Sequence, residues 1–153
     1  MGATEINSKE RIINIISSCK VCHIGMSDKN NNPYVLPFNF GIKDNYIWFH
    51  SSKEGKKIDI LTINPKVCVS FSTDYELASR HDNVACSYFM RYKSVLVYGE
   101  IEVVTDYDKK IEGMNIIMKQ YTGKDDFKYN SPSINNVNIF KLKINKITGR
   151  AYI

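Results

Sequence analysis

The sequence lacks any segment that would place the chain in or across a membrane. It has no run of about 18 consecutive apolar residues, the minimum for a transmembrane helix, so we expect no membrane partner. Its N-terminus, MGATEINSKERI, also lacks the apolar core of a secretory signal, which predicts a cytoplasmic protein with reduced cysteines. No repeat, linker or low-complexity segment divides the chain, so we expect a single domain over residues 1–153.

Cysteine is scarce, and its spacing does not predict a metal site. Cys19 and Cys22 have CxxC spacing, but a structural zinc site needs a second close pair, and Cys68 and Cys86 lie far apart along the chain. A redox-active CxxC begins a helix, whereas this one leads into the strand-like sequence VCHIGM. We therefore expect no metal and interpret Cys19 and Cys22 as small buried residues.

Positive charge is only slightly in excess. The net charge is +5, and the chain has no long basic run. This balance favours small anionic ligands, and we expect no nucleic-acid partner. A nucleic-acid-binding small barrel is an alternative based on the cluster of Tyr88, Arg91 and Tyr92; it predicts a colourless protein whose binding weakens steeply with salt.

What is present is a β-rich pattern with helices inserted. Alternating apolar runs predict strands over residues 21–26, 34–41, 46–49, 66–72, 92–104 and 137–147. Helical spacing predicts helices over residues 8–17, 53–63 and 107–121, whereas residues 73–92 and 127–136 have no period and are expected to be loops. Gly99 indicates a bend of the kind that barrels need at corners. The pattern predicts an α+β, mainly β, antiparallel barrel with peripheral helices.

The stretch WFHSSKEGKKIDIL, residues 48–61, places three lysines where a helix is expected to begin. A helix start is the positive end of the helix dipole, so Lys53, Lys56 and Lys57 destabilise it unless something negative lies there. A bound anion would make these lysines stabilising instead of destabilising. Among anions, a phosphate would accept from the largest number of the donors here, because it has several oxygens. The alternative is a solvated, charged helix end.

A phosphate at this turn would have several further partners. The hydroxyl groups of Ser51 and Ser52 and the backbone N–H groups would converge on it with Lys56 and Lys57, and Gly55 would permit close approach of the backbone. His50, at the end of an apolar strand, favours a functional site over a solvated helix end.

The stretch PYVLPFNFG predicts an exposed sheet edge. Pro37 removes a ladder donor in mid-strand, which is typical of an edge strand. Phe38 and Phe40 share one face and Asn39 lies on the other, so the edge offers carbonyl groups and an amide to a flat polar ring. The alternative is an ordinary edge whose phenylalanines belong to the core.

Taken together, the ordered motifs resemble a known family. The strings PYVLPFNFG, WFHSSKEGKKIDIL, NPKVCVSF, MRYKSVLVYGEIEVV, MKQYTG and KITGRA are similar to the nitroimidazole-resistance branch of the pyridoxamine 5′-phosphate oxidase-like flavoproteins, over about residues 9–151. The resemblance implies a split β-barrel of antiparallel Greek-key type. It also implies a homodimer that holds FMN in clefts between the two subunits.

The resemblance implies a role for each matching residue. The FMN phosphate is expected at Ser51, Lys56 and Lys57. The flavin ring is expected along Pro37, Phe38, Asn39 and Phe40, with His50 beside it as the catalytic or substrate-orienting group. Arg91 and Ser94 are expected to approach the flavin from the neighbouring subunit.

The implied function is an FMN-dependent oxidoreductase. Reduced FMN would pass electrons to a small nitro or aromatic acceptor, and a nitroimidazole would be reduced to its amine. Oxidation of pyridoxamine phosphate is not expected, because few arginines other than Arg91 and Arg150 are placed to hold a substrate phosphate. The alternative is a non-catalytic flavin- or haem-binding storage or sensor protein of the same fold.

Overall fold

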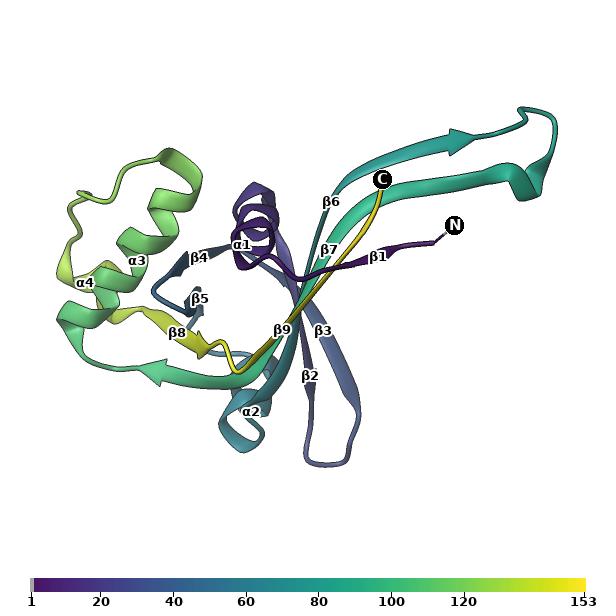
Figure 1. The fold of residues 1–153 in the computed structure, drawn as a ribbon. Helices are drawn as coiled ribbons and strands as arrows, with labels where there is room; N and C mark the ends of the chain where they lie inside the picture. The colour runs from purple at the N-terminus through teal and green to yellow at the C-terminus, as the bar shows by residue number, and fades with distance from the viewer. Residues whose placement is uncertain (1) are drawn as a thin grey trace.

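The computed structural model describes residues 2–153. These residues form antiparallel strand pairs with helices packed against them (Figure 1). In chain order the elements are β1 (Thr4–Ile6), α1 (Lys9–Ser18), β2 (Cys22–Ser27), β3 (Pro33–Phe38), β4 (Phe40–Lys43), β5 (Tyr46–Ser52), α2 (Lys56–Ile63), β6 (Lys66–Ser79), the 3₁₀ turn η1 (Ala85–Ser87), β7 (Tyr88–Val104), α3 (Tyr107–Thr122), α4 (Ser131–Asn135), β8 (Val137–Lys143) and β9 (Lys146–Tyr152).

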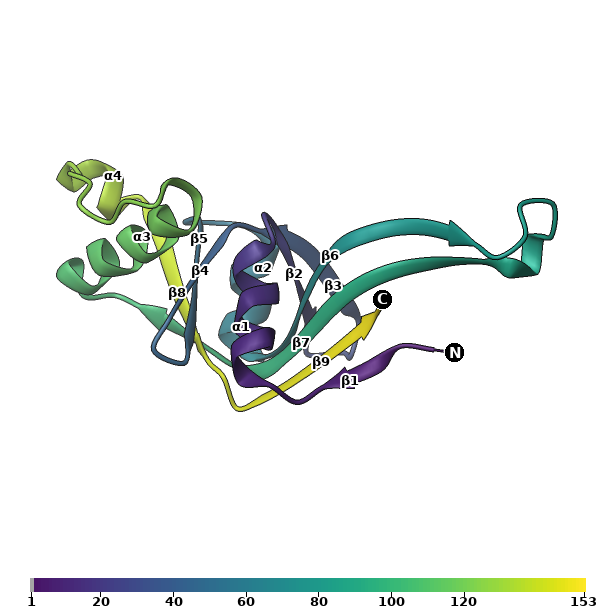
Figure 2. The same ribbon diagram turned by 45° about the horizontal axis from the view of Figure 1, so that its top comes forward.

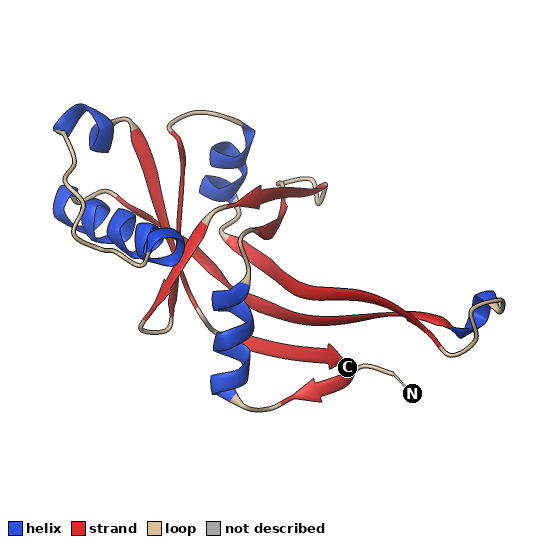
Figure 3. Cartoon of the chain, turned by 90° about the horizontal axis from the view of Figure 1, so that it is seen from above, coloured by secondary structure: helices blue, strands red, loops and turns tan. Residues whose placement is uncertain are grey.

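The sheet is open, as expected for a split barrel. Its strand order is β3-β2-β6-β7-β8-β5-β4, and β9 pairs with both β7 and β1. β7 pairs with β9 over residues 92–98 and with β8 over residues 101–104, so it changes partner around Gly99. A side chain at Gly99 would collide with the backbone of Lys143, which explains the glycine at this corner. β1 and β9 lie side by side, so the chain ends are close together (Figure 3). The predicted fold class is confirmed.

Two apolar clusters hold the fold together. The larger fills the barrel and contains the fully buried rings of Phe40, Phe49, Phe71 and Phe140, covered by the isoleucine stripe of α1. The smaller lies between α3 and the sheet and contains Trp48. The two clusters therefore pack against opposite faces of β5.

Close packing of α3 requires two glycines. A Cβ at Gly41 of β4 would lie 2.5 Å from the carbonyl oxygen of Ile116, and one at Gly113 of α3 would lie 2.6 Å from the ring of Trp48. These contacts position α3 directly over β4 and β5.

The two cysteines of the CxxC sequence are buried thiols. Cys19 and Cys22 belong to the larger core cluster, and both are free. Burial raises the pKa of Cys22 to about 12, so its thiol is protonated and poorly reactive at neutral pH. Their interpretation as small buried residues is confirmed.

The predicted loop over residues 73–92 is wrong. β6 continues to Ser79 and β7 already begins at Tyr88, so the two strands form a long arm that projects from the barrel (Figure 2). A bulge between Thr73 and Glu76, with Asp74 at φ 57°, interrupts the alternation. Because much of the arm is solvated on both faces, it shows no apolar period in the sequence.

The remaining differences concern element ends. The strand predicted over residues 34–41 is divided at Asn39 into β3 and β4, and the strand over residues 137–147 is divided into β8 and β9. α2 begins at Lys56 rather than at residue 53, and the predicted loop 127–136 contains α4. None of the helices within residues 2–153 is long and apolar enough to cross a membrane.

Candidate functional site

The start of α2 is built to leave backbone donors free. α1, α3 and α4 are each capped by a side chain, whereas α2 begins at Gly55 without a side-chain cap. Gly55 has φ 134° and ψ 168°, a conformation that is essentially restricted to glycine. The N–H groups of Ile58 and Asp59 bond to the carbonyl of Gly55, so the first N–H groups of the helix remain available to a ligand.

The lysines at this helix start lie over the edge strand β3. The Lys57 Nζ is 5.9 Å from the ring centre of Phe38, and the Lys56 Nζ is 4.7 Å from that of Tyr34. The two ammonium groups therefore point to different parts of β3. Lys57 lies beside the predicted ring-binding segment, and Lys56 lies further along the strand.

The hydroxyl groups of Ser51 and Ser52 bond within the turn. Ser51 is buried and its hydroxyl donates to the carbonyl of Ser52 at 2.9 Å, while the Ser52 hydroxyl donates to the carbonyl of Glu54 at 3.2 Å. The Asn138 amide of β8 donates to the carbonyls of Ser52 and Lys53 at 3.4 and 3.0 Å. These bonds hold the turn between β5 and α2 in one conformation.

The phenylalanines of the edge strand belong to the core. The Phe40 ring packs edge-on against Phe71 with centres 4.9 Å apart, and the Phe38 ring lies 6.0 Å from that of Phe49. β3 pairs only with β2, so one side of its backbone is unpaired within the described chain, as the exposed Pro37 indicated. The edge therefore offers backbone groups, and the ordinary interpretation of the phenylalanine rings as core is correct.

Tyr121 of α3 holds the junction between β3 and β4. Its hydroxyl accepts hydrogen bonds from the Asn39 amide and the Phe40 N–H, both at 3.2 Å, and donates to the carbonyl of Lys20 at 2.7 Å. The sequence showed Tyr121 only as the end of an apolar helix stripe. Nothing in its spacing revealed a partner more than 80 positions away.

His50 lies on the face of β5 that is turned toward α3. Side chains alternate along a strand, so His50 shares this face with Trp48 and Ser51 faces the barrel interior. Burial lowers the pKa of His50 below its usual value of 6.5. At neutral pH the ring is uncharged and carries one N–H donor and one acceptor.

Arg91 and Ser94 lie on β7 at the arm and its base. The Arg91 Nη1 is 3.3 Å from the Glu76 carboxylate, and Ser94 is paired with Ser72 on one side and Arg150 on the other. The arm extends away from α2 (Figure 1). One copy of the chain therefore does not bring these two residues to the start of α2.

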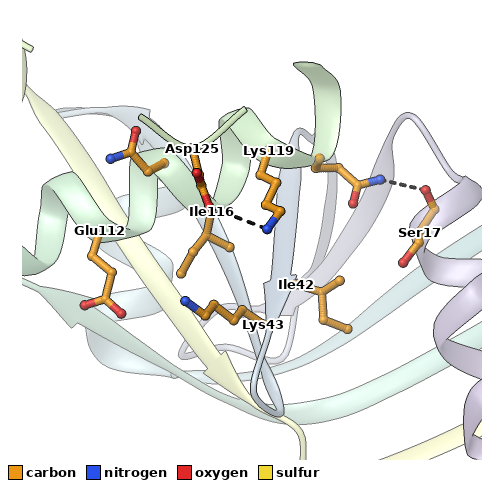
Figure 4. Close-up of a pocket in the computed structure, with 9 residues that line it drawn as sticks. Ser17, Ile42, Lys43, Glu112, Ile116, Lys119 and Asp125 are labelled. Atoms are coloured by element: carbon orange, nitrogen blue, oxygen red, sulfur yellow. Dashed lines mark hydrogen bonds and ion pairs between the residues drawn. The ribbon is translucent and has the colours of Figure 1, made fainter. Parts of the chain in front are cut away.

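A cavity of about 590 Å³ lies elsewhere, between α3, β4 and the end of α1 (Figure 4). No predicted site residue lines it. Its charged walls partly neutralise each other, since Lys119 lies 3.5 Å from Asp125, and the Gln120 amide donates to the carbonyl of Ser17 at 2.8 Å. No local pattern in the sequence predicts this cavity, because three separate elements form it.

Comparison with known proteins places this geometry in a family. The pyridoxamine 5′-phosphate oxidase family matches residues 8–151, and no curated protein matches the chain. A crystal structure described as a candidate 5-nitroimidazole antibiotic resistance protein from Bacteroides thetaiotaomicron is 37% identical, with TM-score 0.87, covering 98% of this chain and 87% of that one.

More distant structures share the fold alone. The flavocytochrome Anf3 from Azotobacter vinelandii is 18% identical with TM-score 0.83, over 97% of this chain and 69% of that one. A FAD- and haem-binding protein from Mycobacterium smegmatis is 16% identical with TM-score 0.83, over 96% and 72%. Together with the family match and the 37% identical structure, the open barrel confirms the resemblance inferred from the motifs: the chain belongs to the pyridoxamine 5′-phosphate oxidase-like family.

Proposed function

We propose that this chain binds FMN and uses it to reduce small nitroaromatic acceptors of the 5-nitroimidazole type. The observation that carries the proposal is the start of α2, where free N–H groups, Gly55 and Lys57 lie beside the unpaired edge of β3. An anionic group fits the helix start, and a flat ring with polar edges fits the strand backbone. The 37% identity to the resistance protein supports the choice of acceptor.

Each residue has a defined part in this proposal. The N–H groups of α2 and the Lys57 ammonium bind the phosphate, and Lys56 adds positive charge along the edge. Ser51 fixes the turn that presents these donors. Bound FMN supplies the electrons for reduction of the acceptor.

The residues at the ring hold its position and orient the acceptor. The backbone from Pro37 to Phe40 would hold the flavin ring, and Asn39 is kept in place by Tyr121. His50, uncharged at neutral pH and on the α3 side of β5, would donate its N–H to an acceptor bound beside the ring.

We further propose a homodimer in which Arg91 and Ser94 approach the partner's flavin. The outer face of the sheet exposes Val35, Leu77, Met90 and Tyr98, while α1 and α2 both pack on the inner face. Apolar side chains exposed on one face in this way support an interface there. The buried Nε of Arg91 has no hydrogen-bond partner in the described chain, so one copy of the chain leaves this donor unsatisfied. Sedimentation of the purified protein as a monomer would contradict this arrangement.

Reoxidation of the bound flavin by a nitro compound tests the function. We expect purified protein to show flavin absorption bands and, after anaerobic reduction, to be reoxidised by a 5-nitroimidazole. With a chemical reductant in excess, three successive two-electron turnovers of the flavin should convert each nitro group to the amine and two water molecules. His50→Ala should retain flavin and lose turnover, whereas His81→Ala, a control at the tip of the arm, should behave as wild type. Flavin that stays reduced in the presence of the nitro compound would instead indicate the non-catalytic binding protein.

A further inference from the structure

The hydroxyl group of Tyr121 makes every hydrogen bond that a phenol can make. It has one proton to donate and two lone pairs that accept. The carbonyl of Lys20, which can only accept, takes the proton at 2.7 Å. The N–H of Phe40, which can only donate, occupies one lone pair at 3.2 Å. The remaining lone pair faces the side-chain amide of Asn39, also at 3.2 Å.

These partners fix the orientation of the Asn39 amide. Because the Tyr121 proton is already donated, its oxygen can only accept from Asn39, so the NH₂ group of Asn39 points to Tyr121. The amide oxygen, Oδ1, therefore points away from Tyr121. Within residues 2–153 this Oδ1 accepts no hydrogen bond, and Asn39 is exposed. The chain thus presents an acceptor of fixed orientation to a group from outside.

Asn39 lies where the two edges of the open sheet meet. β3 and β4 stand at opposite ends of the strand order, and Asn39 alone connects them. On one side of it, the Cys22 thiol donates to the carbonyl of Phe38 at 3.6 Å. On the other side, Tyr121 holds the N–H of Phe40. Both neighbours of Asn39 are therefore held by other elements, which preorganises the amide for a ligand at the sheet edge.

Tyr121 is itself anchored by contacts that need no ligand. The adjacent Gln120 amide donates to the carbonyls of Ser17 and Cys19 at 2.8 and 3.4 Å, so the end of α3 is tied to the connection between α1 and β2. The rings of Tyr121 and Phe40 also pack edge-on, with centres 6.4 Å apart. The hydroxyl group is thus held in place before a ligand binds.

The flavin ring has a single imide N–H, at ring atom N3, which requires an acceptor. It lies between two ring carbonyl groups, which accept and cannot serve as its partner. We propose that Asn39 Oδ1 accepts the N3–H of bound FMN, and that Tyr121 is the positioning residue that keeps the amide turned this way. This inference rests on the proposed function, which places the ring along residues 37–40, and it adds the polarity of one contact and the residue that sets it.

A flavin without the N3 proton tests the contact. In 3-methyl-FMN a methyl group replaces this proton, while the phosphate and the remaining ring atoms are those of FMN. Bound 3-methyl-FMN would leave Asn39 Oδ1 without a donor. We expect wild type to bind FMN roughly five- to tenfold more tightly than 3-methyl-FMN, measured by fluorescence titration of flavin-free protein.

The ratio of the two dissociation constants separates a positioning role from general support of the fold. Tyr121→Phe keeps the aromatic ring and leaves Asn39 in place, but it removes the oxygen that fixes the amide. The preference for FMN over 3-methyl-FMN should therefore fall at least about threefold. Equal weakening of both flavins, with the wild-type ratio retained, would show that Tyr121 only supports the fold and would overturn its positioning role.

A double variant tests whether Tyr121 acts through Asn39. Asn39→Ala removes the acceptor and should also reduce the preference for FMN. Asn39→Ala combined with Tyr121→Phe should have the same ratio as Asn39→Ala alone, because the amide that Tyr121 orients is then absent. A ratio that falls further in the double variant would contradict this order of action.

A second tyrosine–asparagine pair on α3 provides the matched control. The Tyr129 hydroxyl donates to Asn115 Oδ1 at 3.0 Å, and Asn115 lines the cavity beside α3 and not the junction of β3 and β4. Tyr129→Phe removes a hydrogen bond of the same kind and should retain the wild-type ratio. Urea unfolding of both tyrosine variants checks that each is folded under the conditions of the titration.

Two results in wild type distinguish this contact from the proposed function. Equal affinity for FMN and 3-methyl-FMN would overturn the N3 contact and leave flavin binding in place. A protein that binds neither flavin would contradict the proposed function, and the contact with it.

Discussion

Replacing Gly55 by alanine isolates the contribution of the helix start to ligand binding. At φ 134° and ψ 168°, an alanine carries a backbone strain of about 1–3 kcal/mol. The added Cβ would meet no atom within 4 Å, so strain is the whole effect. The variant either keeps this geometry at reduced stability or rotates the first peptide units of α2 and loses their N–H groups as phosphate donors.

Gly123 provides a control of the same kind at a remote position. It ends α3 at φ 76°, and a Cβ there also meets nothing within 4 Å. Gly123→Ala should lose about 1 kcal/mol of unfolding free energy and bind FMN as wild type does.

The assay combines urea unfolding with fluorescence titration of FMN and riboflavin. If the turn rotates, Gly55→Ala should lower FMN affinity by roughly tenfold for each 1.4 kcal/mol of phosphate-binding free energy that is lost. Riboflavin has no phosphate, so its affinity should be unchanged. A Gly55→Ala protein with wild-type stability and wild-type FMN affinity would refute this description of the turn.

Three further predictions concern the elements around the site. Gly41→Ala should destabilise the protein by about 1–3 kcal/mol in urea, because its Cβ would lie 2.5 Å from the Ile116 carbonyl oxygen and α3 would have to move; an unchanged midpoint would contradict the close packing. Tyr121→Phe should lower the free energy of unfolding by about 1 kcal/mol and weaken FMN binding, because the N–H of Phe40 loses its acceptor. Wild-type stability and wild-type FMN affinity would show that Tyr121 does not hold the junction between β3 and β4. The free energy of unfolding should fall as the pH drops below 6.5, because the pKa of His50 is lower in the folded chain and the unfolded chain therefore binds the proton first. His50→Gln should flatten this part of the plot of urea midpoint against pH. An unchanged plot would show that His50 titrates normally.

Local signals in the sequence were sufficient for the capped helices. Ser8 and Asp106 accept the N–H groups expected of helix caps, and α1 and α3 follow within one residue of the predicted bounds at each end. Gly123 directly follows the helix predicted to end near residue 121, and it ends α3 in the left-handed conformation that favours glycine. These features depend on neighbours a few residues away.

Features that depend on distant contacts were not predictable. The break at Asn39 requires Tyr121 from another element, and the arm has no apolar period because solvent lies on both of its faces. Lys110 is covered only because α3 packs on the sheet, and nothing in its local sequence shows this. Sequence can place a charge on an element but cannot show what the element is packed against.

The candidate site was predictable to the extent that it is local. The charged turn and the edge strand are each short segments, and the structure brings Lys57 of one to Phe38 of the other. The different directions of Lys56 and Lys57 follow from their positions on α2, which begins later than the sequence indicated. Arg91 lies on the arm, which extends away from α2, and only the proposed homodimer would bring it to a flavin.

A crystal structure of the protein with FMN bound tests the central claim most directly. We predict the phosphate at hydrogen-bond distance from the first N–H groups of α2 and from the Lys57 ammonium, with the ring along β3. A phosphate bound away from the start of α2, or a ring that does not contact residues 37–40, would contradict the account.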